Sequence, residues 1–451
     1  MKRLYYSVVA SLTAALLSAC SAGTAVPSSS HGSPSLSRLP LHARKASSGL
    51  IQHVVIIVQE NRTFDNLFQG FPGANTAGSG LNSHGRTITL RPMNLTAPWN
   101  VMHSHDNFER EYAAGQLNGF DLAKSVCGGT GCPTRGLRAY GYVPQSQVGP
   151  YWSMAQSYTI ADNMFQSNEG PSFPAHQYLI SGTSSTSDGS PQLASENPDQ
   201  GLGGCDSPAG TKVRTIDSYG QQGSPVFPCF DRESLMDLLD ENSLTWHYYQ
   251  ATSGPGLWNA PDAVSPTYGS PEFSSDVVVP SSQFLTDVGN GVLSNVTWIT
   301  PTAQASDHPI LNDGTGPDWV ASVVNAIGQS QFWDNTAIFV VWDDWGGWYD
   351  HVTPPNYSSY DLGFRVPMLV ISPYANTGYV SHVQHEFGSI LKFTEEQFDL
   401  PSMGTTDERA DDLSDCFNFD QYPTPFVAIP TVRGKIYFLA HRTSSRIVEE
   451  P

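Results

Sequence analysis

Residues 53–59 read HVVIIVQ, and Glu60-Asn61-Arg62 follow directly. Two further stretches have the same character, TAIFVVW at residues 336–342 and VPMLVIS at residues 366–372. Each is an unbroken run of mostly apolar residues of strand length, which is typical of strands buried on both faces of a sheet. We therefore predict that these three stretches are buried strands of one sheet.

Helix-like segments lie between and after these strands, at residues 232–241, 318–328 and 388–398. Strands that alternate with helices predict an α/β fold, a three-layer α/β/α sandwich with a mostly parallel central sheet. The sequence contains no internal repeat and no change of composition after the first 50 residues, so one domain is predicted for residues 50–451. The 40 glycines and 33 prolines favour long loop insertions in this domain.

Composition and charge exclude two classes of protein. Only 14% of the residues are charged, against roughly 25% in typical soluble proteins, and 39% are hydrophobic. A disordered chain has the opposite composition, with many charges and few apolar or aromatic residues. The formal net charge is −20, and such a field repels the phosphate backbone of nucleic acid. We therefore expect no nucleic-acid partner.

The first 20 residues have the layout of a signal peptide. A positively charged start precedes an apolar stretch that is too short to span a membrane, and residues 17–20 read LSAC. This ending resembles the bacterial lipobox, in which the cysteine becomes the lipidated first residue, and an ordinary secretory signal is the alternative. Residues 21–49 are rich in Ser and Pro, which suits a flexible tether. We expect an exported bacterial lipoprotein that is anchored to the membrane through Cys20 and faces the periplasm or cell exterior.

The other five cysteines agree with export. Cys127 and Cys132 enclose a short Gly-rich stretch, and Cys205 with Cys229 could close a longer loop. Proximity along the chain thus favours two disulfides, which persist in oxidising compartments. Cys416 remains, and we expect it to be a buried thiol. The sequence contains neither CxxC pairs nor His-rich ligand spacing, so no structural zinc site is predicted.

Carboxylates follow two of the predicted strands at the point where each strand ends. Glu60 and Asn61 follow the first strand, and Asp343 and Asp344 follow the strand at residues 336–342. Ligands of open α/β sheets gather at the carboxyl ends of strands, and oxygen donors without thiolate suit a hard divalent cation. The alternative is that these are turn or capping residues, which are common after strands. Spacing alone favours neither interpretation.

Six longer stretches contain recognisable motifs in a consistent order. They are ENRTFDNLF (60–68), GPSFPAHQYLISG (170–182), SDHP (306–309), DDWGGWYDHVTPP (343–355), FRVPMLVISPY (364–374) and QHEFGSILKFTEEQFDLP (384–401). Together they resemble the bacterial phosphoesterase family, which contains phospholipases C and secreted acid phosphatases and belongs to the alkaline-phosphatase-like superfamily. The resemblance runs from about Leu50 to Phe419, and it implies the alkaline-phosphatase-like form of the α/β/α sandwich.

The resemblance implies roles for eight residues. Four match the family's metal-binding positions: Glu60, Asn61, Asp343 and Asp344. Asp344 stands where the family more often has Glu. Ser172, in GPSFP, matches the Ser or Thr nucleophile, and Ala175 stands where the family usually has Asn. Three histidines match positions that bind the substrate and take part in catalysis: His103, His308 and His351. We assign His176 and His385, which also lie in family-like stretches, to structural roles.

These residue types fit the hydrolysis of a phosphate ester. The negative charge of the ester repels a nucleophile, so positioning and charge stabilisation do most of the catalytic work. A Ser hydroxyl is a weak nucleophile at neutral pH and can be activated by a metal. Attack by Ser172 would give a phosphoseryl enzyme that water hydrolyses, while histidines bind phosphoryl oxygens or protonate the leaving group. One divalent metal ion is expected, with Mg, Ca, Mn and Zn as candidates.

The leading function is therefore an exported, metal-dependent phosphatase of the acid-phosphatase type, acting on small phosphate esters. The chain ends soon after the family core, without the long C-terminal extension of some larger phospholipases C, and we therefore expect broad activity on small phosphate esters. The alternative is a phospholipase C that acts on the headgroups of phosphatidylcholine-type lipids. A second alternative is a non-catalytic surface lipoprotein, against which the joint presence of the four metal-position residues and Ser172 argues. The sequence contains neither a GxSxG nor an HExxH motif, so a lipase elbow and a zinc protease site are not supported.

Overall fold

The computed structural model describes residues 49–442. The predicted signal peptide with Cys20, and residues 21–48 of the predicted tether, lie outside the described residues. These described residues group into one compact unit. Among the described residues, no helix combines the length and the apolar character that crossing a bilayer requires.

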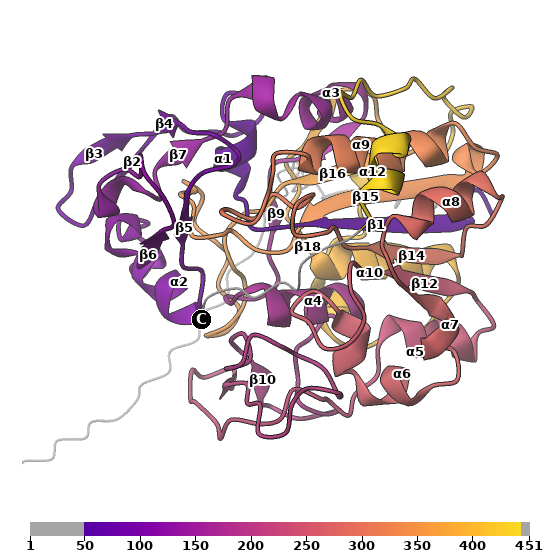
Figure 1. The fold of residues 1–451 in the computed structure, drawn as a ribbon, viewed down its shortest axis with the longest axis horizontal. Helices are drawn as coiled ribbons and strands as arrows, with labels where there is room; N and C mark the ends of the chain where they lie inside the picture. Colours follow the sequence, from indigo (N-terminus) through magenta and orange to yellow (C-terminus); the bar gives the residue numbers. More distant parts are fainter. Residues whose placement is uncertain (1–48, 443–451) are drawn as a thin grey trace, which may run out of the picture. The chain divides into compact units, whose positions relative to one another are not determined.

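An eight-stranded sheet lies at the centre of this unit, with the strand order β13-β12-β14-β1-β15-β16-β8-β17 (Figure 1). In chain order, the strands are β1 (His53–Gln59), β8 (Thr159–Ala161), β12 (Trp246–Tyr249), β13 (Val277–Val278), β14 (Val296–Ile299), β15 (Thr336–Trp342), β16 (Met368–Ile371) and β17 (Tyr379–Ser381). In the described part of the chain, β16 runs antiparallel to β15 and β8, and the other pairings in this sheet are parallel. The prediction of a mostly parallel sheet is confirmed, and β1, β15 and β16 are adjacent in it.

Helices lie on both sides of the sheet in Figure 1. One group contains α3 (Gly149–Ser157), α8 (Gln283–Gly289), α9 (Gly316–Gly328) and α12 (Lys435–Ala440), and the other contains α4 (Ser172–Ser181), α5 (Leu235–Glu241) and α10 (Phe387–Gln397). The helix predicted at residues 232–241 begins at Leu235. Ser234 caps it by accepting a hydrogen bond from the backbone N–H of Asp237, whose side chain bonds back to the backbone of Ser234. This reciprocal capping box defines the first turn and leaves residues 232 and 233 outside the helix.

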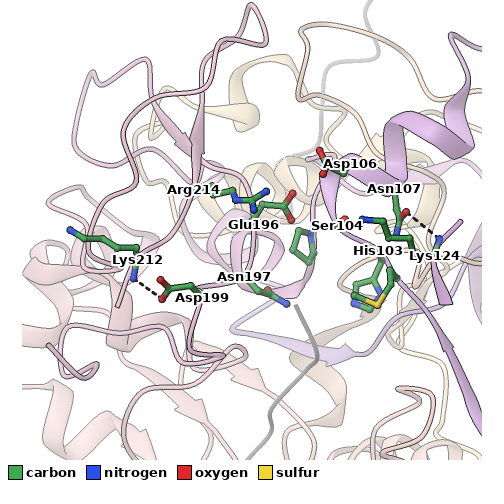
Figure 2. A pocket seen from close by; sticks show the side chains of 12 residues that line it. His103, Ser104, Asp106, Asn107, Lys124, Glu196, Asn197, Asp199, Lys212 and Arg214 are labelled. Carbon is green, nitrogen blue, oxygen red and sulfur yellow. Dashed lines mark hydrogen bonds between the residues drawn. The ribbon is translucent and has the colours of Figure 1, made fainter. Parts of the chain in front are cut away.

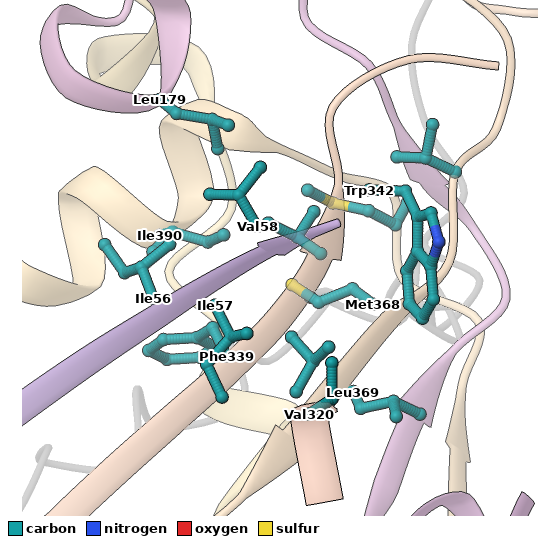
Figure 3. Close-up of a cluster of buried hydrophobic side chains, with 14 of the residues drawn as sticks. Ile56, Ile57, Val58, Leu179, Val320, Phe339, Trp342, Met368, Leu369 and Ile390 are labelled. Atoms are coloured by element: carbon teal, nitrogen blue, oxygen red, sulfur yellow. The ribbon is translucent and has the colours of Figure 1, made fainter. Parts of the chain in front are cut away.

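The hydrophobic core surrounds β1 and β15 (Figure 3). All seven residues of β15 are buried, and so are the last six of β1. In Figure 3, Ile56 and Val58 lie on the side of Leu179 and Ile390, whereas Val320 of α9 lies on the opposite side. Both faces of these strands are therefore covered, which explains why their sequences are continuous apolar runs and not alternating ones.

Two long insertions connect elements of this framework. The first carries short paired strands, β2 (Ser79–Leu81) with β3 (Thr87–Thr89), β4 (Arg91–Pro92) with β7 (Gly141–Tyr142), and β5 (Trp99–Val101) with β6 (Ser125–Cys127), together with helix α2 (His105–Tyr112). The second carries β10 (Leu193–Ala194) paired with β11 (Thr215–Ile216). The prediction of long loop insertions is confirmed, and both insertions contribute residues to the site described below.

Both predicted disulfides are present, Cys127–Cys132 and Cys205–Cys229, and Cys416 is a buried free thiol. Replacing Cys205 and Cys229 with Ser should lower the free energy of unfolding by about 3 kcal/mol, because the bond closes a loop with a sequence separation of 24. Replacing Cys127 and Cys132, which have a sequence separation of 5, should lower the free energy of unfolding by about 1 kcal/mol less than this. Denaturant unfolding of both variants measures the difference. Equal losses would contradict the loop-entropy argument.

Candidate active site

The register of two parallel strands brings the candidate carboxylates together. Gln59, the last residue of β1, pairs with Trp342, the last residue of β15. The ladder continues one step further, because the backbone N–H of Asp343 donates to the carbonyl of Gln59 at 2.9 Å. The backbone N–H of Asn61 then donates to Asp343 Oδ1 at 3.0 Å. The two acidic segments therefore leave the sheet side by side.

The backbone after each strand is sharply turned. Asn61 has a φ of 61°, a left-handed conformation that Asn tolerates better than most residues do. Gly346, two residues after Asp344, has a φ of 63°, and a Cβ at this position would lie 2.2 Å from the carbonyl oxygen of Asn61. The N–H of Gly346 donates to Asp344 Oδ1 at 2.7 Å. The close approach of the two turns thus requires glycine and fixes the direction of the Asp344 side chain.

Ser172 is the first residue of α4 and is fully buried in the same cluster. Its hydroxyl lies 3.1 Å from Asp344 Oδ2 and 3.4 Å from Glu60 Oε2. Asn61 Nδ2 donates to Ser172 Oγ at 3.1 Å and to Asp344 Oδ2 at 2.8 Å. Because Ser172 opens a helix of 10 residues, the positive end of the helix dipole also favours negative charge at this point.

His103 joins the cluster from the first insertion. Its Nδ1 lies 3.1 Å from the carbonyl of Val101, which can only accept, so Nδ1 carries the proton. Asn61 Nδ2 also lies 3.2 Å from His103 Nε2. Because the amide has only two hydrogens, this contact competes with those to Ser172 Oγ and Asp344 Oδ2. The same Nε2 lies 3.9 Å from Asp344 Oδ2. The contact with the Val101 backbone therefore sets the tautomer in which Nε2 faces the cluster.

His308 is buried beside His103, with the two ring centroids 5.9 Å apart. Its Nδ1 donates to the carbonyl of Pro309 at 2.7 Å, which again leaves Nε2 as the second nitrogen. Arg62 holds this loop, since its Nη2 donates to the carbonyl of Asp307 at 2.7 Å. Burial raises the pKa of the Asp307 carboxyl to about 6, although the charge of Arg62 opposes this shift. This role of Arg62 was not predicted from the sequence. Its position directly after Glu60 and Asn61 could have indicated it.

The structure does not bring His351 into this cluster. His351 Nδ1 lies 2.6 Å from Asp65 Oδ2, and Nε2 lies 2.9 Å from Asn75 Oδ1. Asp65 also lies 3.6 Å from Arg365. Asp65 lies in the first turn of α1 (Phe64–Phe68), and its carboxylate is buried in the ion pairs with His351 and Arg365. His351 thus belongs to a separate charged network under the turn that follows β15.

The His351 contact predicts a pH dependence of stability. Burial lowers the pKa of His351, but the hydrogen bond and the charge of Asp65 outweigh it and raise that pKa above 6.5. A histidine whose pKa is raised on folding contributes stability below its unfolded pKa and loses it as the pH rises through the folded value. The stability difference between wild type and His351→Gln should therefore shrink from pH 6.5 upward. Urea unfolding of both proteins between pH 5 and 9 measures it, and a constant difference would contradict the assignment.

His176 also lies in this cluster, although a structural role was predicted for it. It is buried, and its Nε2 lies 3.0 Å from Glu60 Oε1 and 3.7 Å from Asp343 Oδ2. The sequence contained a signal for this position, because His176 follows Ser172 by four residues and residues i and i+4 share one face of a helix. His385, by contrast, contacts Asp411 and Ser381, and its structural role stays a prediction.

A cavity of about 390 Å³ adjoins the cluster (Figure 2). His103 and Pro171, the neighbour of Ser172, belong to its lining. Six charged residues of both signs also line it: Asp106, Lys124, Glu196, Asp199, Lys212 and Arg214. Burial raises the pKa of Glu196 to about 7, and the charge of Arg214 opposes this shift. Within the described part of the chain, the lining of this cavity includes no Phe, Tyr or Trp.

Known proteins resemble this chain in sequence and in structure. A non-hemolytic phospholipase C of Burkholderia pseudomallei is 24% identical over 88% of this chain and 63% of its own length. Phospholipase C B of Mycobacterium tuberculosis is also 24% identical, over 83% of this chain and 79% of its own length. A solved structure of an alkaline phosphatase superfamily protein from Vibrio parahaemolyticus covers 81% of this chain and 70% of its own, with 11% identity and a TM-score of 0.38.

The chain spans less than two thirds of the length of the first of these phospholipases. The model of the Phosphoesterase family matches residues 51–401, a range that includes β1, β15 and the whole cluster around Ser172. The match covers well over half of the chain. This protein is therefore a member of the Phosphoesterase family.

Proposed function

We propose that the protein hydrolyses phosphate esters, with Ser172 as the nucleophile. The observation that carries this proposal is the position of Ser172 Oγ, within 3.4 Å of Asn61, Glu60 and Asp344 at the start of a helix. Attack on phosphorus would form the Ser172 Oγ–P bond and break the bond to the leaving oxygen, which takes up a proton. Water would then hydrolyse the phosphoseryl intermediate and regenerate the hydroxyl.

The donor set fits a bound divalent cation. Glu60, Asp343 and Asp344 are all fully buried within one cluster, and like charges this close repel each other unless a cation neutralises them. Asn61 Nδ2 now faces Ser172 Oγ and Asp344 Oδ2, so the amide would have to turn over to offer Oδ1 to an ion. Oδ1 is buried and accepts no hydrogen bond from the described residues, so this turn would break none made by that oxygen. These four residues, with Ser172 Oγ, would hold the ion. When bound, it would lower the pKa of the Ser172 hydroxyl and offset the charge of the phosphoryl group.

Two histidines are oriented to act on the phosphoryl group. Backbone carbonyls fix the Nδ1–H of His103 and of His308, so both rings present Nε2 as the second functional atom. An imidazolium at either position could donate to a non-bridging oxygen or protonate the leaving oxygen. We propose a structural role for His351, because its contacts are with Asp65 and Asn75.

Among phosphate esters, we propose phospholipids as the leading substrate class, in a phospholipase C reaction. The support is that the curated relatives described above are phospholipases C. Small phosphomonoesters are the second candidate, favoured by the small, charged cavity beside His103. A quaternary ammonium group is commonly bound by aromatic side chains, which this lining does not supply.

The deciding experiment compares p-nitrophenyl phosphate, p-nitrophenyl phosphorylcholine and phosphatidylcholine vesicles, each with and without chelator. Release of diacylglycerol at a rate above that of p-nitrophenyl phosphate hydrolysis would support the phospholipase proposal. Preference for the monoester would support the second candidate. Hydrolysis of none of the three, by protein reloaded with divalent metals, would contradict both.

We also propose that the protein is an exported lipoprotein anchored at Cys20. The two disulfides support export, since such bonds persist outside the reducing cytosol. Labelled palmitate should be incorporated into the wild-type protein and not into Cys20→Ala. Equal labelling of both proteins would contradict the anchor.

A further inference from the structure

Helix α4 supplies two polar side chains to the cluster, Ser172 and His176. They are four residues apart and therefore face the same way. His176 is 1% exposed, and its Nε2 is directed at two carboxylates, Glu60 and Asp343. Nε2 and one oxygen from each carboxylate lie within 4.8 Å of one another, and all three residues are buried.

We propose that His176 is a direct ligand of the cation, through Nε2, so that the centre combines nitrogen and oxygen donors. This inference rests on the proposed function, because it concerns the same ion. Two atoms bound to one ion at ~2.1 Å, in tetrahedral or octahedral geometry, lie roughly 3.0–3.5 Å apart. The separations of Nε2 from Glu60 Oε1 and Asp343 Oδ2, 3.0 and 3.7 Å, lie close to this range. An ion between the three side chains could therefore bind all of them with small side-chain movements.

The competing interpretation is a hydrogen bond from Nε2–H to Glu60 that merely orients the carboxylate. Such a bond needs one acceptor at a suitable distance, and Glu60 Oε1 provides it. The position of Nε2 near a second carboxylate, Asp343, is not needed for that role and is what coordination requires. Both carboxylates stand at positions that the proposed function already assigns to the ion.

A nitrogen donor changes which ion the centre prefers. Carboxylate and amide oxygens alone suit Mg²⁺ and Ca²⁺, whereas imidazole favours first-row transition ions such as Mn²⁺, Fe²⁺ and Zn²⁺. Direct ligation by His176 therefore predicts selectivity for transition ions over Mg²⁺ and Ca²⁺. If His176 only orients Glu60, the centre should keep the preference of an all-oxygen site for Mg²⁺ and Ca²⁺.

The test is pulsed electron paramagnetic resonance of the Mn²⁺-loaded full-length protein. Wild type should show the coupling of a directly bound imidazole nitrogen, and ¹⁵N labelling of histidine should change that coupling. His176→Asn should lose the signal, and it should weaken the binding of Zn²⁺ by a larger factor than the binding of Ca²⁺. His53→Asn, a half-buried histidine at the end of β1 opposite Glu60, should retain the signal and the affinity.

The outcomes separate this inference from the proposed function. Mn²⁺ that binds in wild type and is lost in Asp343→Asn, without a histidine nitrogen coupling, would overturn only the role of His176. A histidine nitrogen coupling that survives in His176→Asn would also overturn only the role of His176. Failure of wild type to bind any divalent ion at the cluster would overturn the metal-dependent function itself. The labelled wild-type measurement remains decisive even if His176→Asn does not fold.

Discussion

Replacing Ser172 with Ala is expected to lower kcat for phosphate ester hydrolysis by at least about 10³-fold. The substitution removes the only protein atom that forms a bond to phosphorus in the proposed mechanism, while the carboxylates and histidines around it remain. Because the hydroxyl is fully buried against Asp344 and Glu60, its loss leaves room for little more than a water molecule. Substrate binding should therefore change much less than turnover. Steady-state kinetics on the best substrate of the panel measure both.

Ser181→Ala is the matched control, because Ser181 is a buried serine at the other end of the same helix. It should retain activity. A second measurement uses a substrate labelled with ³²P and an acid quench, after which peptide mapping should place the label on Ser172. Labelled wild-type protein with the phosphate on another residue would contradict the nucleophile assignment. So would a Ser172→Ala variant with wild-type turnover.

The main features of the fold could be predicted because the central strands are buried on both faces. Covered strands must be apolar along their whole length, so β1 and β15 were visible as continuous runs. The rule that ligands gather at the carboxyl ends of strands then indicated Glu60 and Asp343 as candidates. Their closeness was not predicted and follows from the register of Gln59 with Trp342. The small paired strands of the first insertion were not visible, since strands of two or three residues carry no periodic pattern.

The histidines were harder to assign, because the direction of a side chain depends on turns that sequence spacing does not determine. His351 follows Asp343 by only eight residues, yet Gly346 and Gly347 both have positive φ and redirect the chain. The imidazole of His351 therefore faces Asp65 and not Ser172. His176 lies on a regular helix, where the i, i+4 rule applies. That rule predicts that His176 lies on the same face of the helix as Ser172.

Replacing Asp343 with Asn is expected to have opposite effects on activity and on the stability of the metal-free protein. Activity should fall by at least about 10²-fold, because a charged ligand of the ion is lost. The metal-free protein should become more stable by roughly 1–3 kcal/mol, since one of three fully buried carboxylates no longer carries charge. The amide oxygen of Asn can still accept the backbone N–H of Asn61, which Asp343 Oδ1 accepts at 3.0 Å. The substitution thus removes charge repulsion without removing this hydrogen bond.

Adding the preferred ion should reverse the order of stability. A ligand at 1,000 times its dissociation constant stabilises the folded state by about 4 kcal/mol, and Asp343→Asn should gain little of this. Asp318→Asn is the control, because Asp318 is also buried but accepts the backbone N–H groups of Val432 and Arg433, each at 3.0 Å. It should be less stable than wild type with and without metal, and fully active. Urea unfolding with chelator and with added metal measures all three proteins. If Asp343→Asn were less stable than wild type under both conditions, the carboxylate would be a structural acceptor and not a ligand, because repulsion among buried charges is relieved only by a cation or by loss of charge.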